Sequence, residues 1–282
     1  MKIGSQIGVP YDKQLFDSNF RILLDKVIAE GITLPTGVQQ IAGDLLIREL
    51  KVAGVWDKLD VFYVFATGNS PLATLNWINP SAHRATLHSS PSFVATKGFE
   101  GDGSSSYLSL NYNPSTATAR NYTQNSASIG VYTNGDNNVG TPVDYGVDAF
   151  DFPIALDANT RIRFPHRNTG GNRLNSSGAP STQLFPSTTS GLIGLQRTSS
   201  TNLDALDASG NLNSNGSSAR SAGVSTSGSI ANATFEIFRY NPGTPQFGQS
   251  QAAMAWVGAS FTAAEWSAYV TAANKYYTTV TS

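Results

Sequence analysis

The sequence contains no cysteine. This absence excludes a small domain stapled by disulfides, a thiolate metal site and a cysteine nucleophile. A chain without cysteine folds equally well in reducing and oxidising surroundings. That property would suit a protein that is assembled inside a cell and then released from it.

Charged residues are also scarce, at 13% of the chain against about 25% in an average globular protein. The net charge is -1, so there is no basic surplus to neutralise phosphates, and we expect no direct binding of nucleic acid. No polybasic stretch is present to hold an anionic membrane surface. The sequence has no run of about 18 apolar residues, and its start, MKIGSQIGVP, lacks the apolar core of a signal peptide. We therefore expect no membrane insertion.

The few charges that exist are unevenly distributed. Residues 1–60 carry 7 Lys/Arg and 8 Asp/Glu, which is 15 of the 37 charged side chains of the chain. The rest is dominated by Ser, Thr, Asn, Gly and Ala. This shift in composition predicts an arm and helical attachment or oligomerisation segment over residues 1–55, followed by a β domain over residues 56–282.

Two helices are predicted in the first segment. Residues 11–30 place apolar side chains at steps of three and four, and Gly31 suits the end of a helix. A second helix is expected to start near Pro35 and to stop at Gly54, with Val38, Ile41, Leu45, Leu46 and Leu50 at helical spacing. Their apolar faces need cover, either from the following sheet or from a partner subunit.

After Trp56 the sequence becomes rich in short apolar and β-branched runs separated by Asn-Gly, Gly-Gly, Ser-Gly and Pro-Gly turns. Many short strands without intervening helices predict a mainly β, antiparallel β-sandwich. Residues 165–190 and 208–232 are long and polar, so they are either exposed loops or edge strands. The predicted strands are 60–66, 74–78, 92–96, 106–110, 127–132, 160–164, 191–197, 202–207, 233–240 and 252–258.

The chain is expected to close with a helix over residues 262–278. Thr262 and Glu265 have the spacing of a capping box, in which each side chain binds the backbone N–H of the other residue. Phe261 and Trp266 stand at the positions of a hydrophobic staple across the start of this helix.

No motif for catalysis or metal binding emerges. Glu100 and Asp102 form the sharpest acidic cluster, but Gly-Asp-Gly before three serines is typical of a turn. Asn134 to Asn138 carries oxygen ligands suited to calcium, yet it lacks the spacing of an EF-hand loop and favours an Asn-rich turn. The acidic residues Asp144, Asp148, Asp151 and Asp157 do not support a calcium site by their spacing either. We predict no catalytic residue, no metal and no cofactor.

The three histidines, His83, His88 and His166, show no ligand spacing. Tyrosines in polar surroundings are better candidates for a binding face, because an aromatic ring can stack on a sugar. Tyr107 and Tyr112 are the residues we select as candidate glycan contacts, with filling of the sandwich core as the alternative.

Three stretches resemble virion proteins of tailed phages. Residues 98–110, Gly-Phe-Glu-Gly-Asp-Gly-Ser-Ser-Ser-Tyr-Leu-Ser-Leu, resemble the opening strand of concanavalin A-like (laminin-G-like) sandwich domains in these proteins. Residues 252–282, beginning Ala-Ala-Met-Ala-Trp-Val-Gly, are similar to the closing strand and helix of the same proteins. Residues 55–66 look like the lead-in of structural proteins from phages that infect Bacteroidetes, including crAss-like phages. The resemblance spans about residues 35–282 and implies a concanavalin A-like jelly roll.

The resemblance and the composition together suggest a virion structural protein, a head fibre, decoration or tail-appendage subunit, and not an enzyme. Its expected partners are other virion proteins and copies of itself, with a trimer by analogy to other appendages. Its expected location is the virion, assembled in the host cytoplasm. The alternative is a carbohydrate-binding module that attaches to a host surface glycan. A glycan depolymerase is less favoured, because it needs a close carboxylate pair that the sequence does not display.

Overall fold

The computed structural model describes residues 15–118, 120–134, 154–157, 160–162, 173–176, 190–214, 226–240 and 246–282. Every structural statement below concerns these residues. The sequence candidates Asp136, Asn137, Asn138, Asp144, Asp148, Asp151 and His166 lie outside them.

A helical hairpin begins the described chain. Helix α1 (Ser18–Ala29) starts at Asp17, whose side-chain carboxylate accepts the backbone N–H of Asn19. Helix α2 (Gly37–Val52) starts with a capping box between Thr36 and Gln39. Both predicted helices are confirmed, but a start of the first helix at residue 11 was wrong. Asp17 has a non-helical backbone and occupies the cap, so the helix begins only at Ser18.

The first sheet is assembled around β15 (Gln251–Gly258). Strand β6 (Ala127–Thr133) pairs along one edge of β15, while β1 (Leu59–Val64) and β4 (Gly98–Glu100) share the other edge. All these pairings are antiparallel. Beyond β6 follow β9 (Gly191–Arg197), β10 (Leu203–Leu206) and β11 (Leu212–Ser214), and beyond β4 follows β3 (Ser92–Val94).

The second sheet is made of shorter strands. In spatial order they are β14 (Gln246–Phe247), β13 (Arg239–Tyr240), β7 (Ile154–Asp157), β12 (Glu236–Ile237), β5 (Tyr107–Ser109) and β2 (Thr86–His88), with β8 (Thr160–Ile162) paired to β7. Its pairings are antiparallel except for one parallel contact between β13 and β7.

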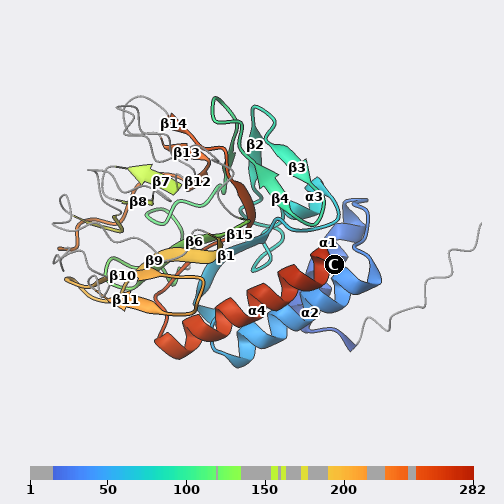
Figure 1. Cartoon of the computed structure of the whole chain (residues 1–282), viewed down its shortest axis with the longest axis horizontal. Helices are drawn as coiled ribbons and strands as arrows, with labels where there is room; N and C mark the ends of the chain where they lie inside the picture. The colour runs from blue at the N-terminus through green and yellow to red at the C-terminus, as the bar shows by residue number, and fades with distance from the viewer. Residues whose placement is uncertain are drawn as a thin grey trace, which may run out of the picture.

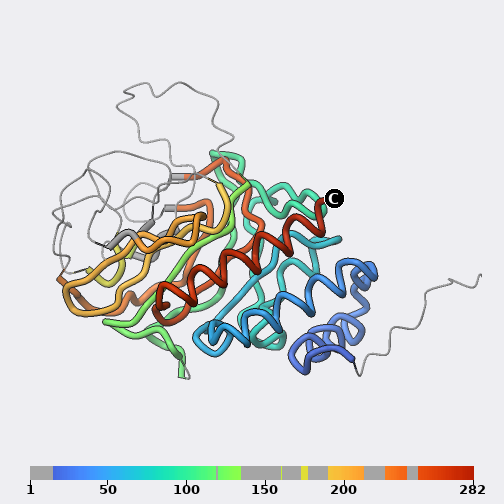
Figure 2. The backbone as a smooth tube through the Cα atoms, turned by 60° about the horizontal axis from the view of Figure 1, so that its bottom comes forward, coloured from blue at the N-terminus to red at the C-terminus, as the bar shows by residue number. Residues whose placement is uncertain are grey.

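The molecule has three layers, because the first sheet is buried on both faces (Figure 1, Figure 2). Successive residues of β1 alternate between two cores: Val61 and Tyr63 join the core shared with the second sheet, whereas Phe62 and Val64 join the core under the helices. Helices α2 and α4 (Ala263–Thr281) lie side by side on this helical face (Figure 1). The first sheet therefore covers the inner faces of α2 and α4.

This arrangement confirms a mainly β, antiparallel sandwich with an N-terminal helix pair and a C-terminal helix. The finer expectation of a concanavalin A-like jelly roll remains a prediction. The predicted domain boundary at residue 55 also remains a prediction. It falls between α2 and β1, and side chains of both elements belong to the same hydrophobic core.

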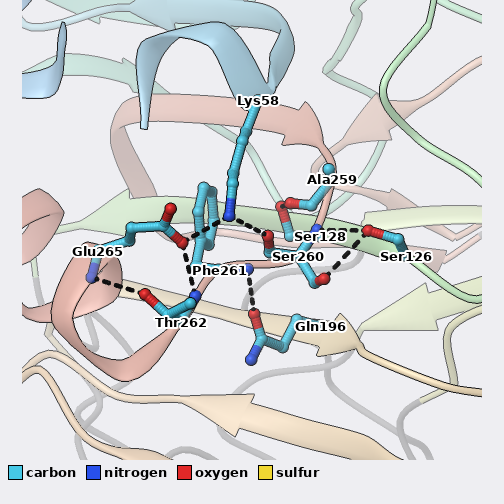
Figure 3. A network of polar contacts seen from close by, with 9 residues as sticks. All are labelled: Lys58, Ser126, Ser128, Gln196, Ala259, Ser260, Phe261, Thr262 and Glu265. Atoms are coloured by element: carbon cyan, nitrogen blue, oxygen red, sulfur yellow. Dashed lines mark hydrogen bonds and ion pairs between the residues drawn. The ribbon is translucent and has the colours of Figure 1, made fainter. Parts of the chain in front are cut away.

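A polar network fixes the start of α4 on the first sheet (Figure 3). The predicted capping box between Thr262 and Glu265 is present, and the helix continues to Thr281, three residues beyond the predicted end. Lys58, just before β1, lies 2.6 Å from the Glu265 carboxylate and also donates to the carbonyl of Ser260. The backbone N–H of Phe261 donates to Gln196 of β9. The start of α4 is thus bonded to the turn before β1 and to strand β9, both distant from it in sequence.

The strand predictions were largely correct for the longer strands. Residues 191–197 match β9 from end to end, and 233–240 splits into β12 and β13 because Phe238 has a positive φ of 68°. The prediction of a strand at 74–78 was wrong: the Asn76 side chain accepts the N–H of Ile78, two residues later, which turns the chain there, and it also accepts the N–H of Phe62. The sequence did not predict the short elements β2, β4, β7, β11, β14 and α3 (Ser70–Ala73).

Candidate functional site

An aromatic stack lies on the second sheet around Tyr107. His88 of β2 and Tyr107 of β5 are directly opposed across the strand pair, and their rings stack with centroids 4.3 Å apart and planes 4° from parallel. The guanidinium carbon of Arg239 lies 4.5 Å from the centroid of the same tyrosine ring. Arg239 also pairs with Glu236 at 3.3 Å. Phe247 completes the group, with its centroid 6.3 Å from that of Tyr107.

This stack restricts what Tyr107 can bind. Two groups within 4.5 Å of the ring centroid cannot share one face, so His88 and Arg239 cover opposite faces of Tyr107. A sugar that stacks on an aromatic ring needs a free face. In this arrangement a ligand would reach only the edge of Tyr107 and the outer parts of its neighbours.

Tyr112, the other glycan candidate, lies in the sandwich core and is only 1% exposed. Its hydroxyl donates to the carboxylate of Asp60 at 2.8 Å, and its ring stacks on Phe235. Burial, together with the nearby Asp60, raises the pKa of this hydroxyl well above its ordinary value. The structure thus does not bring Tyr107 and Tyr112 together on one surface, and Tyr112 fills the sandwich.

The acidic turn at Asp102 is stabilised by hydrogen bonds between the Asp102 carboxylate and the backbone of the same turn. Its Oδ1 atom accepts the backbone N–H groups of Ser104, Ser105 and Ser106 at 2.8–2.9 Å. Burial alone would raise the pKa of Asp102, but these hydrogen bonds outweigh burial and hold the pKa far below its ordinary range. A general acid needs a raised pKa, so the geometry gives Asp102 the role of a turn-stabilising carboxylate.

The histidines are separated in the described chain. His83 Nδ1 lies 2.7 Å from the carbonyl of Asn111, whereas His88 is stacked on Tyr107. Within the ranges that the structure describes, no three His, Asp or Glu side chains gather closely enough to hold a metal ion. Asn134, at the start of the predicted Asn-rich turn, donates to Gln251 at 2.7 Å.

The helical hairpin carries most of the exposed apolar surface. Eight of the ten large apolar side chains that are exposed in the described part of the chain lie between residues 15 and 52. They are Leu15, Ile22, Ile28, Leu34, Val38, Ile41, Leu45 and Val52. The two others, Leu87 and Val94, lie on short strands and are each 36% exposed. A large exposed apolar patch marks a protein-binding surface.

The sequence of α2 contains apolar residues on two faces of the helix, but their spacing alone did not show that there are two faces. Val38, Ile41 and Leu45 were predicted at helical spacing together with Leu46 and Leu50, with cover from the sheet or from a partner subunit. In the structure Leu46 and Leu50 are buried, whereas the first three are exposed. At 100° per residue the two sets point in different directions, so α2 carries two apolar faces and the sheet covers only one.

No family model and no curated protein matches this sequence. Among solved structures, the chain is similar to domain 4 of AbnA, a GH43 extracellular arabinanase from Geobacillus stearothermophilus, determined in complex with arabinotriose. The two are 13% identical over 76% of this chain and 98% of that one, with a TM-score of 0.43. A likeness at this level carries no argument about the fold or the ligand of this chain. None of the described helices is long and apolar enough to cross a bilayer.

Proposed function

We propose that this chain is a structural subunit of a larger assembly, attached through its helical hairpin and displaying its β-sandwich outward. The observation that carries the proposal is the concentration of exposed apolar side chains on the hairpin. Apolar side chains in water cost about 25 cal/mol for each Å² that a partner would cover, so such a surface favours association.

The proposed assembly is the virion of a tailed phage, with the chain as a head fibre, decoration or tail-appendage subunit. Support comes from the sequence resemblance of residues 98–110 and 252–282 to virion sandwich domains. The hairpin surface fits the same role, because a displayed subunit needs one end that binds and one that faces solvent.

This function is tested by fractionation of particles. Particles would be purified by density gradient from a lysate of cells that produce the chain, then probed with an antibody against the full chain and labelled with gold. The proposal predicts that the chain co-sediments with particles and that gold marks their surface. Recovery of the chain only from the soluble, particle-free fraction would overturn it.

A carbohydrate-binding module is the second candidate. It is favoured by the grouping of partly exposed rings at His88, Tyr107 and Phe247 beside the cation of Arg239. Rings and guanidinium groups are common in sugar sites, because they supply apolar faces and fixed hydrogen-bond donors. In this role the stack would bind a glycan on the displayed side of the sandwich.

Glycan binding is tested on an array of host polysaccharides with wild type, Tyr107→Ala and the matched control Leu87→Ala. A binding site at the stack predicts that Tyr107→Ala weakens the array signal at least tenfold, because the rings of His88 and Phe247 lose their support. Leu87→Ala, which lies next to His88 in sequence but outside the stack, should keep the signal. Equal binding by all three proteins, or by none, would remove this candidate.

A further inference from the structure

One exposed stripe on α2 is more regular than the rest of the hairpin surface. Val38, Ile41, Leu45 and Val52 are 57%, 39%, 39% and 91% exposed, and their spacing of three, four and seven residues places them on a single face of the helix. We call these four residues the α2 stripe. Spacing of this kind is the seam along which one helix packs on another.

The charges next to the α2 stripe are already neutralised within the chain. Arg48 lies within the stripe, between Leu45 and Val52, but its guanidinium pairs with Asp44 at 2.6 Å and donates to the carbonyl of Leu15. On the two flanks, Lys51 pairs with Asp17 and Lys275 of α4 pairs with Glu49. A partner that approaches the stripe therefore meets apolar side chains and the neutral Arg48–Asp44 ion pair, without unbalanced charge.

Two of the four stripe residues, Val38 and Val52, lie symmetrically about Leu45, whereas the position that mirrors Ile41 is Glu49. Val38 and Val52 are each seven residues from Leu45, so the stripe has the same residue type at both ends. An interface with a two-fold axis places the same patch on both subunits and requires the patch to be self-complementary. If two α2 helices cross antiparallel with their Leu45 side chains at the axis, Val38 of one copy meets Val52 of the other.

We infer that the α2 stripe binds the α2 stripe of a second copy of this chain, in an antiparallel pair with the two-fold axis at Leu45. Electrical neutrality supports this occupant, because a charged patch would repel its own copy. The four side chains expose on the order of 400 Å² of apolar surface, as large as the biggest patch on a typical monomer. Two such stripes bury on the order of 800 Å², which is below the ~1,200 Å² of a small specific interface, so the association is expected to be weak and to depend on concentration.

This inference rests on the proposed function, since it names the partner of the hairpin surface, but the two fail separately. A chain that sediments with particles and never pairs with itself would keep the function and remove the dimer. A chain that pairs with itself and is absent from particles would keep the dimer and remove the proposed function.

Because the chain has no cysteine, single introduced cysteines test the pairing directly. The full chain carrying Leu45→Cys would be oxidised mildly at several concentrations, and the dimer fraction read on a non-reducing gel. Residue 45 faces itself across the proposed axis, so this variant should form a disulfide-linked dimer in at least half of the molecules. The control Ile28→Cys, which is 56% exposed on α1 and outside the stripe, should stay largely monomeric.

A second pair of variants fixes the direction of the helices. Val38→Cys and Val52→Cys should cross-link poorly alone and efficiently when mixed, because the antiparallel pair brings residue 38 against residue 52. Cross-linking of each alone, without gain on mixing, would indicate parallel helices and overturn the proposed geometry. Leu45→Cys that cross-links no better than Ile28→Cys would overturn the proposal as a whole.

Discussion

At the scale of single residues, a pair of glycines makes room for an indole ring of the helical core. Gly130 of β6 and Gly194 of β9 are cross-strand partners, and both lie under the indole of Trp256. A Cβ atom on Gly130 would lie 2.0 Å from the indole ring and 2.3 Å from the backbone oxygen of Ile193. The ring is 1% exposed, and its Nε1 atom donates to Ser128. These glycines are required for space and not for backbone freedom.

We predict that Gly130→Ala lowers the free energy of unfolding by about 1–3 kcal/mol, the usual cost of overpacking a core. Urea unfolding followed by tryptophan fluorescence measures it. The matched control is Gly68→Ala, where the three atoms nearest the new Cβ belong to the partly exposed Gln39 side chain, the closest at 3.0 Å. The control should remain within about 0.5 kcal/mol of wild type. A Gly130→Ala protein as stable as wild type would contradict the packing described for Trp256.

At the scale of secondary-structure elements, α4 shows how local signals and distant contacts combine. Its capping box was evident from Thr262 and Glu265, and its staple places the rings of Phe261 and Trp266 6.1 Å apart. The bond from Lys58 to Glu265 was not evident, because the two residues are 207 positions apart in sequence. Burial alone would raise the pKa of Glu265, but the hydrogen bonds from Lys58 and from the Thr262 N–H outweigh burial and lower the pKa.

This shift predicts a dependence of stability on pH. Because the pKa of Glu265 is lower in the folded chain than in the unfolded chain, its carboxylate stabilises the fold above the unfolded value of about 4.3. That contribution disappears as the pH falls through the folded pKa. Glu265→Gln should therefore cost about 1 kcal/mol at pH 7 and progressively less below pH ~4.

Urea unfolding of wild type and Glu265→Gln at pH 7, 5, 4 and 3 measures this dependence. Glu49→Gln is the control, because Glu49 pairs with Lys275 on the surface and caps no helix. Such an exposed pair contributes at most about 0.5 kcal/mol. A difference between wild type and Glu265→Gln that does not shrink at low pH would argue against the ionised cap.

How far the sequence predicts an element depends on where its bonding partners lie. The helices and the longer strands were predictable because their capping residues and apolar periods are local, as in β9 and α4. Strands β2, β7 and β14 of the second sheet were not predicted, since their pairing is set by neighbours distant in sequence. Contacts distant in sequence also explain why the sequence did not distinguish the buried Tyr112 from the partly exposed Tyr107. Tyr112 is buried because Asp60, 52 residues earlier, accepts its hydroxyl, and nothing near Tyr112 indicates this.

At the scale of the whole molecule, the layers explain why the helical side and the sandwich side have different surfaces. The first sheet is covered by helices on one face and by the second sheet on the other (Figure 1), so its strands contribute to both hydrophobic cores. The sheets leave few large apolar side chains exposed in the described part of the chain, whereas the hairpin keeps an outer apolar face. That asymmetry of the surface is the central observation behind attachment through the hairpin and pairing through α2.

Sedimentation equilibrium of the full chain tests this account most directly, with wild type, Leu45→Lys and the control Ile28→Lys measured from about 1 to 200 µM. Wild type and Ile28→Lys should approach twice the mass of one chain as concentration rises. Leu45→Lys, which places two ammonium groups at the proposed axis, should weaken the association at least 100-fold and keep the mass of one chain. A wild type that stays at the mass of one chain throughout, or that reaches three times this mass, would rule out two-fold pairing through α2.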